Sequence, residues 1–227
     1  MEIIRSCSTV HTTLKAGRQI EYIVIHYTAG VTSRGGTAAN TAAYYNTTST
    51  QVSSDFIVDD KTVVQYNPDI KNRYTWHCGG TYYGNKGGTF YRICSNVNSI
   101  GVEICSTNST GKMTNPNDAY YSFTDAAVAN AVLLTRQLMQ EYNIPAEKVI
   151  RHYDVTGKLC PGIVGWNAES GSEKEWEKFK SRLTGKTESG GKLYRVQVGA
   201  FGNRENAEKY LKTVQKYFPD AFLKEGD

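Results

Sequence analysis

The sequence predicts an α/β protein, because short apolar strands alternate with amphipathic helices along most of the chain. Two segments carry this prediction. The run IEYIVIHY at 20–27 is typical of a buried strand, and apolar residues recur at helical spacing between Thr124 and Tyr142. With 227 residues, 39% of them hydrophobic, the chain has the size of one full domain with a small unit appended.

The first half of the chain contains the strand at 20–27, which carries His26 near its C-terminal end. TAANTAAYYNTT at 37–48 predicts a helix, and SSDFIVDDKTVVQY at 53–66 predicts two short strands joined by a turn at Asp59 and Asp60. A β-branched strand that ends in a histidine would deliver that side chain to the rim of a sheet.

A second core strand is predicted at 98–107, NSIGVEICST. Strand periodicity puts its residues on two faces, which are Ile100, Val102 and Ile104 on one and Gly101, Glu103 and Cys105 on the other. An ionised carboxylate inside such a strand costs several kcal/mol unless it is paired. Glu103 therefore has either a functional role or a salt bridge to Arg or Lys at a sheet edge.

The second half begins with the helix from Thr124, a predicted N-cap, to the Asn-Ile-Pro sequence that follows Tyr142. KVIRHYDVTGKLCPG at 148–162 predicts a short strand and then a loop that carries His152, Lys158 and Cys160. A capping box of Ser172 and Glu175 is predicted to open a helix at 172–183.

The C-terminal segment is predicted to form a separate small β-α-β unit. After a polar linker at 185–192, LYRVQVGAF at 193–201 predicts a strand, 203–218 an amphipathic helix and 220–225 a second strand. Chains below about 40 residues rarely fold without a staple or a partner. The unit at 193–227 should therefore pack on a second copy, on the domain at 1–184, or on further residues.

Composition excludes several classes of protein. The net charge of +4 is spread without runs of Lys and Arg, so a nucleic-acid partner is not expected. Residues 1–20 lack the pattern of a secretory signal, and no apolar run is long enough to span a bilayer. The five cysteines are odd in number and irregularly spaced, so a disulfide framework is not expected.

Three residues form a candidate zinc site. A catalytic zinc takes three protein ligands and keeps one open position, and His26, His152 and Cys160 offer two imidazoles and a thiolate. The alternative for a histidine at a strand end is a structural hydrogen bond. A purely structural zinc would need a fourth ligand, for which His77 or Cys78 is available.

Other polar residues have candidate roles beside that site. Glu103 could take a proton from zinc-activated water, and Lys158 could stabilise an oxyanion, although a solvated loop lysine is the ordinary alternative. Thr28, in the turn after the first strand, and Trp76 and His77, in the Gly-ended loop RYTWHCGG, are expected to line a substrate groove. A stacked core tryptophan is the alternative for Trp76.

At these residues the sequence resembles the N-acetylmuramoyl-L-alanine amidases of the type-2 amidase family, which is related to peptidoglycan-recognition proteins. The resemblance covers about residues 18–168, in the segments YIVIHYTAG, SSDFIVDDKTVVQYNP, YTWHCGG, SIGVEICS and HYDVTGKLCPG. It implies a central mixed β-sheet flanked by helices. It also implies one catalytic Zn²⁺ and hydrolysis of the bond between N-acetylmuramic acid and L-alanine in bacterial peptidoglycan.

The resemblance also implies residue roles. His26, His152 and Cys160 match the zinc ligands, Lys158 the lysine that stabilises the oxyanion, and Glu103 the general acid/base of a subgroup. One departure concerns the base: other members have a tyrosine in the segment that aligns with Ser53, Ser54 and Asp55 here. Either Glu103 does that work or Asp55 contributes.

The C-terminal segment resembles one repeat of a SPOR domain, a family that binds glycan strands stripped of stem peptides and normally has two repeats. A half domain suggests a homodimer formed through the C-terminal unit. The resemblance as a whole suggests a phage-endolysin-like enzyme. Such an enzyme would be made in the bacterial cytoplasm and would reach the wall by holin-type or other release. A non-catalytic peptidoglycan-binding module of the same fold is the alternative; such modules typically lack the cysteine ligand, which is present here as Cys160.

Overall fold

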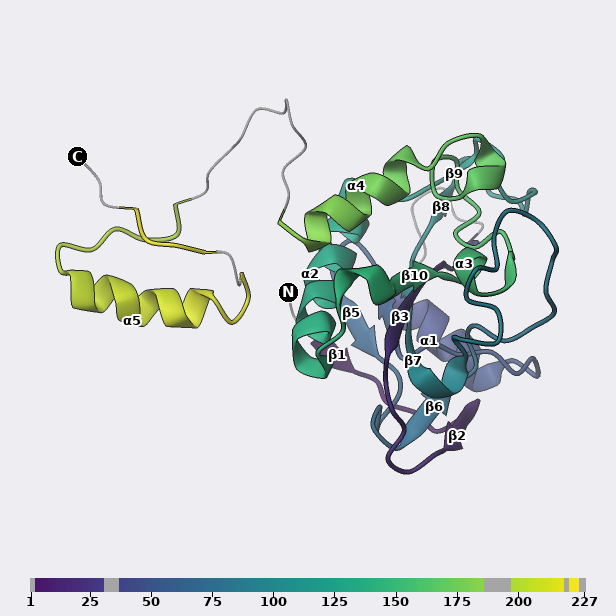
Figure 1. Ribbon diagram of the computed structural model, residues 1–227, viewed down its shortest axis with the longest axis horizontal. Coiled ribbons are helices and arrows are strands. Elements are labelled where there is room, and N and C mark those ends of the chain that lie inside the picture. Colours follow the sequence, from purple (N-terminus) through teal and green to yellow (C-terminus); the bar gives the residue numbers. More distant parts are fainter. Residues whose placement is uncertain (1–2, 31–36, 186–196, 219–220, 225–227) are drawn as a thin grey trace.

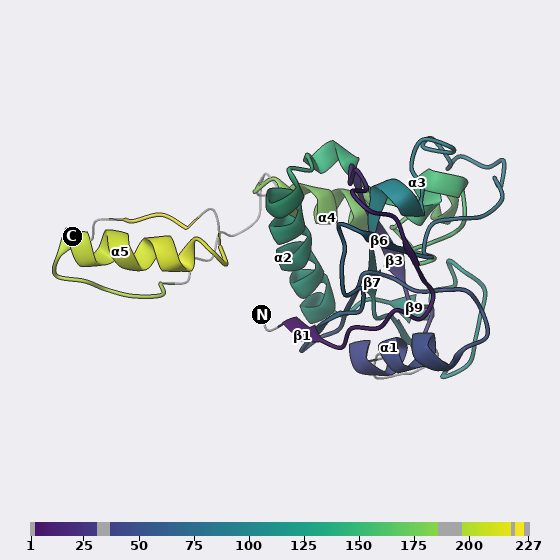
Figure 2. The same ribbon diagram turned by 90° about the horizontal axis from the view of Figure 1, so that it is seen from below.

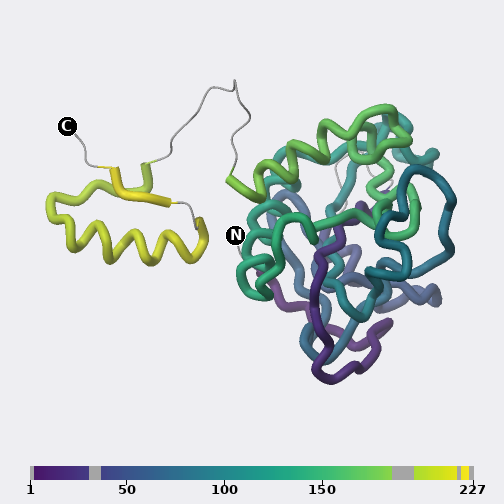
Figure 3. Tube along the Cα trace, viewed as in Figure 1, coloured from purple at the N-terminus to yellow at the C-terminus, as the bar shows by residue number. Residues whose placement is uncertain are grey.

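The computed structural model describes residues 3–30, 37–185, 197–218 and 221–224, and its centre is a six-stranded sheet in the order β1-β5-β4-β7-β3-β10 (Figure 1). These strands are β1 (Ile3–Arg5), β3 (Tyr22–Tyr27), β4 (Phe56–Val58), β5 (Val63–Gln65), β7 (Ser99–Ile104) and β10 (Val149–Arg151). Neighbours pair in parallel except β4 and β5, which are antiparallel, so the sheet is mixed as predicted. In Figure 3 the purple β3 runs beside β7 and β10, which come much later in the chain.

Helices cover both faces of this sheet. They are α1 (Ala38–Thr47), α2 (Asp125–Tyr142), α3 (His152–Thr156) and α4 (Lys174–Leu183), with α5 (Arg204–Val214) in the C-terminal segment. Two small two-stranded sheets, β2 (Thr12–Leu14) with β6 (Arg73–Thr75) and β8 (Thr107–Asn108) with β9 (Tyr121–Ser122), and three 3-10 turns, η1 (Asn96–Asn98), η2 (Ala146–Lys148) and η3 (Ala168–Ser170), complete the described elements. None of the described helices is long and apolar enough to span a membrane.

The main hydrophobic core lies between one sheet face and helices α2 and α4 (Figure 2). Ile23 and Ile25 of β3 and Val102 of β7 contribute fully buried side chains to it. The predicted alternation of β7 is confirmed, because Ile100, Val102 and Ile104 all belong to this core while Cys105 packs in a cluster under α1.

The opposite face of the sheet carries two smaller clusters rather than one. Helix α1 packs over β4 and β5 with Ile57 and Val64, whereas Tyr22 and Val24 of β3 pack with Val155 of α3. Residues of β3 and β7 that point to this face near the strand ends lie between the two clusters. The fold therefore leaves room for polar side chains between α1 and α3.

Helix α2 begins and ends where the sequence predicted. The Thr124 hydroxyl caps it by accepting a hydrogen bond from the Ala127 amide at 3.1 Å, and Asn143 ends it in the left-handed conformation at φ 53°. The predicted strands at 20–27, 53–66 and 98–107 and the helix at 37–48 are also present, each shortened by a few residues at its ends.

Two predictions about the second half were wrong. The capping box of Ser172 and Glu175 is absent, because the carbonyl of Gly165 in the preceding loop accepts the amides of Glu175 and Trp176 and takes over the capping. The segment after β10 is not a plain loop either, since α3 begins at once with His152. Burial of α3 against β3 and β10 stabilises a helix too short to be recognised by periodicity.

The C-terminal segment matches its prediction in part. Helix α5 is present, capped by Asn203, and none of its residues is buried. Residues 197–201 and 221–224 are not in strands, so the described parts of the two predicted strands are not confirmed; 193–196, 220 and 225 lie outside the described residues. Residues of α5 are absent from the hydrophobic clusters found among the described residues.

Candidate metal centre

Two adjacent parallel strands bring the two predicted histidine ligands together. Strand β10 pairs with β3 so that Arg151 lies opposite Ile25. The next residue after Arg151 is His152, the first residue of α3, and the next residue after Ile25 is His26 of β3. Their ring centroids are 5.0 Å apart, and both side chains are buried. Residues 126 positions apart in sequence therefore meet because of strand register, which spacing along the chain does not reveal.

Cys160 reaches the same place because the chain folds back after α3. Gly157 ends that helix in the left-handed region at φ 84°, and its amide donates to the Tyr153 carbonyl at 2.8 Å. The Tyr153 amide in turn donates to the Cys160 carbonyl at 3.0 Å, which holds the returning segment. The Cys160 Sγ lies 3.5 Å from His26 Nδ1, and the ligand atoms of His26, His152 and Cys160 all lie within 4.8 Å of one another.

This cluster is neutral without a cation. Burial lowers the pKa of His152 to about 3 and that of His26 well below its usual value, and the positive charge of Lys158 acts in the same direction on both. Burial, followed by the nearby Glu103, raises the pKa of the Cys160 thiol to about 12. Two neutral imidazoles and a thiol are ready to bind a divalent cation with release of the thiol proton.

The donor set fits zinc. Two nitrogens and one sulfur are the ligands zinc prefers, and three of them leave the fourth tetrahedral position open. Within the described residues, neither ring nitrogen of His152 has a hydrogen-bond partner of normal geometry, although the Gly79 backbone is close enough to affect its pKa. Buried polar atoms are normally satisfied, so the ring is arranged for a partner of another kind.

Glu103 stands beside the cluster on the neighbouring strand. It lies opposite His26 in the parallel register of β7 with β3, so the two side chains project from the same face of the sheet. Its Oε2 atom is buried and has no hydrogen-bond partner among the described residues. Burial raises the pKa of Glu103 to about 8, against the opposing effect of Lys158. A carboxyl with this pKa can gain and lose a proton near neutral pH. The alternative of a salt bridge is not realised in the described residues.

Lys158 is the exposed member of the group. It lies two residues before Cys160, and its charge affects the pKa of Glu103, His152 and Cys160 alike. An ammonium at this position combines access to solvent with influence on the buried groups. An ammonium with these properties is available to stabilise negative charge beside the cluster.

Of the three residues predicted to line a substrate groove, one touches the metal cluster. His77 Nδ1 lies 3.1 Å from His26 Nε2, and only 7% of His77 is exposed. The Trp76 indole instead donates to the Thr13 hydroxyl at 3.1 Å, and the Thr28 hydroxyl accepts the Ser106 amide at 3.1 Å. The contacts of Trp76 and Thr28 are thus with the protein itself.

Asp55 is fully buried and fully engaged. Its carboxylate accepts hydrogen bonds from Asn67 Nδ2 at 2.6 Å, Thr75 Oγ1 at 2.9 Å and the Gly101 amide at 2.7 Å. Three donors leave little capacity for a proton from water. The geometry favours Glu103 over Asp55 as the base.

Sequence reasoning missed Gly101 and Ser99. A side-chain carbon at Gly101 would lie 2.6 Å from His77 Cγ, so only glycine leaves space for that ring. A glycine inside a core strand is a signal of close approach, and SIGVEICS carried it. Ser99 is 3.2 Å from His77 Nε2 through its hydroxyl.

Two family models match the chain. The family model described as N-acetylmuramoyl-L-alanine amidase matches residues 16–163, and the SPOR domain model matches residues 168–225. The second match begins before the predicted linker and includes α4, whose Trp176 and Phe179 pack in the main core.

Curated relatives carry the same description. The N-acetylmuramoyl-L-alanine amidase CwlA of Bacillus subtilis strain 168 is 35% identical over 176 residues, which cover 74% of this chain and 53% of the relative. XlyB of the same strain is 31% identical over 189 residues, or 83% of this chain and 50% of the relative. The chain thus spans about half the length of the curated relatives it matches.

A solved structure, that of PlyL, is 30% identical to the chain and superimposes with a TM-score of 0.56, covering 81% of this chain and 97% of PlyL. The family model spans more than half of the sequence and includes the strands that carry His26 and Glu103 and the helix that begins with His152. The chain belongs to the N-acetylmuramoyl-L-alanine amidase family, with a SPOR domain match at its C-terminal end.

Proposed function

We propose that the chain hydrolyses the amide bond between the lactyl group of N-acetylmuramic acid and L-alanine in bacterial peptidoglycan, with one zinc ion held by His26, His152 and Cys160. The observation that carries the proposal is the buried cluster of these three ligands beside the carboxyl of Glu103. Family membership supplies the substrate class.

A zinc ion held by these ligands would polarise the scissile carbonyl and lower the pKa of water. Glu103 takes the proton of the attacking water and hands it to the nitrogen of the leaving amine. A carboxyl whose pKa is raised to about 8 suits both transfers, because it gains and returns a proton near neutral pH. Its buried Oε2 atom has no competing hydrogen bond within the described residues.

Lys158 contributes a positive charge where negative charge develops. In support of this role, its exposed side chain lies close enough to Glu103 and His152 to affect the pKa of each. When water adds to the carbonyl carbon, the oxygen becomes anionic, and the ammonium stabilises it. The same charge keeps Glu103 from becoming too basic to release its proton.

Two alternatives are less well supported. A binding module without catalysis would not require the complete set of metal ligands together with a carboxyl of raised pKa, Glu103, beside it. A structural zinc would need a fourth ligand, whereas the cluster found among the described residues has three. Both ring nitrogens of His77 face other partners, His26 and Ser99.

The decisive experiment is product analysis after digestion of purified cell walls. An amidase releases stem peptides with a free L-alanine amino group and leaves glycan strands that carry a free lactyl carboxyl, both detectable by mass spectrometry. New reducing sugar ends would indicate a glycosidase, and new ends within the peptide would indicate an endopeptidase. Either result without free L-alanine would overturn the proposal.

For the C-terminal unit we propose a second peptidoglycan contact and a homodimer formed through α5. Support comes from the SPOR match and from apolar side chains that α5 and its flanks expose, which are Phe201, Tyr210, Phe218 and Phe222. Light scattering of the full chain should give a dimer mass, and deletion of residues 186–227 should give a monomer. A monomeric mass for both proteins would remove the dimer proposal.

A further inference from the structure

We propose that His77 is a positioning residue for the metal centre: it holds the His26 ring in the one tautomer that leaves Nδ1 free to bind a cation. The inference deepens the proposed zinc-dependent function and rests on it for the identity of the cation. The observation behind it is a chain of hydrogen bonds that runs from His26 to a backbone carbonyl on the far side of His77.

The series of hydrogen bonds joins four groups: His26, His77, the Ser99 hydroxyl and the Ser95 carbonyl. His26 Nε2 lies 3.1 Å from His77 Nδ1, and His77 Nε2 lies 3.2 Å from the Ser99 hydroxyl. The Ser99 hydroxyl lies 2.6 Å from the carbonyl oxygen of Ser95. On the other side of the first ring, His26 Nδ1 faces the Cys160 sulfur at 3.5 Å.

The direction of each hydrogen bond follows from the last group in this series, the Ser95 carbonyl. A carbonyl oxygen only accepts, so the Ser99 hydroxyl donates its one hydrogen to Ser95 and accepts from His77 Nε2. Burial opposes a charge on the His77 ring, although the neighbouring Cys78 and Asp55 raise its pKa above the usual value. In the neutral ring, a hydrogen on Nε2 leaves Nδ1 bare, and Nδ1 must then accept from His26 Nε2. His26 then carries its hydrogen on Nε2, and its Nδ1 lone pair points toward Cys160 and the cation position.

The His77 ring is itself fixed by the fold. The backbone amides of His77 and Cys78 both donate to the Asn96 side-chain oxygen, at 3.0 and 2.8 Å. The ring lies over Gly101, where any side-chain carbon would approach it to 2.6 Å. Asp55 holds the Gly101 amide at 2.7 Å, so the buried carboxylate braces the strand beneath the ring.

This assignment replaces the expected role of His77 in a substrate groove. A side chain with 7% of its surface exposed offers a substrate little contact, whereas both of its ring nitrogens are used by protein groups. Partners that hydrogen-bond a metal-binding histidine fix its tautomer and orientation, and removing them commonly weakens metal binding about 10- to 100-fold.

The first test needs no variant. Long-range proton–nitrogen NMR of the zinc-loaded, ¹⁵N-labelled protein distinguishes the two tautomers of each imidazole and the doubly protonated ring. We expect His26 and His77 each to carry one hydrogen, on Nε2, with His26 Nδ1 shifted by the metal. A hydrogen on Nδ1 of His77, alone or together with one on Nε2, would overturn the proposal.

The second test measures zinc affinity by competition with a chromophoric chelator. His77→Leu leaves the His26 Nε2 hydrogen without an acceptor and should weaken binding about 10- to 100-fold. His77→Asn keeps an oxygen near the Nδ1 position and should stay within a few-fold of wild type. Ser99→Ala, with the milder change of removing the next acceptor, should fall between the two variants.

Tyr66→Phe is the matched control for general destabilisation. The Tyr66 side chain is buried in the cluster under α1, and its hydroxyl lies 3.1 Å from two acceptors, the Val10 carbonyl oxygen and Asn46 Oδ1. It should lose stability without loss of zinc affinity. If His77→Leu fails to fold, Ser99→Ala and the NMR measurement still decide the question.

Affinity for zinc equal to wild type in both folded His77→Leu and Ser99→Ala would refute the positioning role. The proposed function has a separate readout, because the products of cell-wall digestion are measured with wild-type protein. Loss of zinc affinity in His77→Leu together with an inactive wild type would retain the positioning role and reject the hydrolase. Unchanged zinc affinity in His77→Leu and Ser99→Ala together with an active wild type would reject the positioning role and retain the hydrolase.

Discussion

Replacing Glu103 with glutamine is expected to stabilise the metal-free protein at neutral pH. Burial raises the pKa of Glu103 from 4.5 to about 8, with the charge of Lys158 acting in the opposite direction. The charged form is therefore disfavoured in the fold. Glutamine has nearly the same shape and carries no charge at any pH, and Oε2 has no hydrogen bond among the described residues that the change would break.

The sign and size follow from proton linkage. The unfolded chain loses the Glu103 proton near pH 4.5, whereas the native protein keeps it up to about pH 8. Between these values the unfolded state binds fewer protons, so the free energy of unfolding of the wild type falls as pH rises. At about 1.4 kcal/mol per pH unit, the wild type should lose roughly 3 kcal/mol relative to Glu103→Gln between about pH 5 and pH 7.5.

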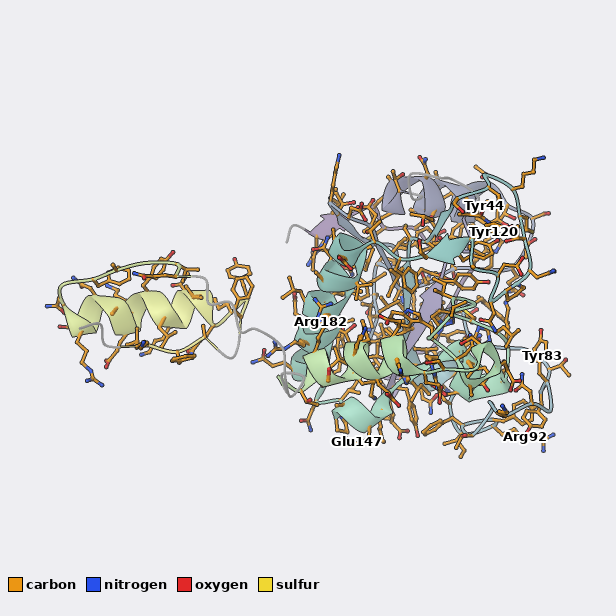
Figure 4. All side chains as sticks on the ribbon, turned by 90° about the horizontal axis from the view of Figure 1, so that it is seen from above. Tyr44, Tyr83, Arg92, Tyr120, Glu147 and Arg182 are labelled. Atoms are coloured by element: carbon orange, nitrogen blue, oxygen red, sulfur yellow. The ribbon has the colours of Figure 1, made fainter. Side chains whose placement is uncertain are left out.

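Thermal unfolding followed by circular dichroism, with a chelator present, measures this difference. For a protein of this size, roughly 3 kcal/mol corresponds to a shift in Tm of about 6–12 °C. Titration of His26 and His152 affects both proteins equally and cancels in the comparison. Glu147→Gln is the control, because Glu147 is an exposed carboxyl at the edge of the molecule (Figure 4). A Tm difference between wild type and Glu103→Gln that stays constant with pH would refute the reasoning.

Three further predictions concern neighbouring residues. Gly101→Ala should push the His77 ring, cost about 1–3 kcal/mol in urea unfolding and weaken zinc binding; unchanged zinc affinity would contradict the close contact. Lys158→Met should lower kcat about 10²-fold with little change in KM, measured by release of L-alanine amino termini, and a change confined to KM would indicate a binding role instead. Asp55→Asn should cost about 2 kcal/mol or more, because the new amide faces donors, while folded protein still cuts; normal stability with lost cleavage would identify Asp55 as the base.

Much of the sheet was predictable, because β3 is a nearly continuous apolar run and β7 has apolar residues at alternate positions. Helix α2 has clear periodicity and caps. Strands β1, β2 and β6 were not predicted. Each has three residues, and tertiary pairing rather than local pattern forms them. Short elements carry too few residues for a hydrophobic period to be recognised.

The candidate site, too, was predictable only in part. His26, His152 and Cys160 could be nominated from the sequence and the family resemblance, and the structure brings them together. Their proximity depends on the register of β3 with β10 and on the turn at Gly157, which local sequence does not specify. The pairing of His77 with His26 could not be predicted from the sequence either, because it depends on the space that the absent side chain of Gly101 leaves for the His77 ring.

The central claim is that zinc bound by His26, His152 and Cys160 drives cleavage of the amide bond. The most direct measurement titrates zinc into metal-free protein and follows the release of L-alanine amino termini from purified cell walls, with Cys160→Ser in parallel. We expect activity to return in wild type and to saturate at one zinc per chain, while Cys160→Ser stays inactive over the same range. Full activity of the metal-free protein, or of Cys160→Ser without bound zinc, would contradict the account.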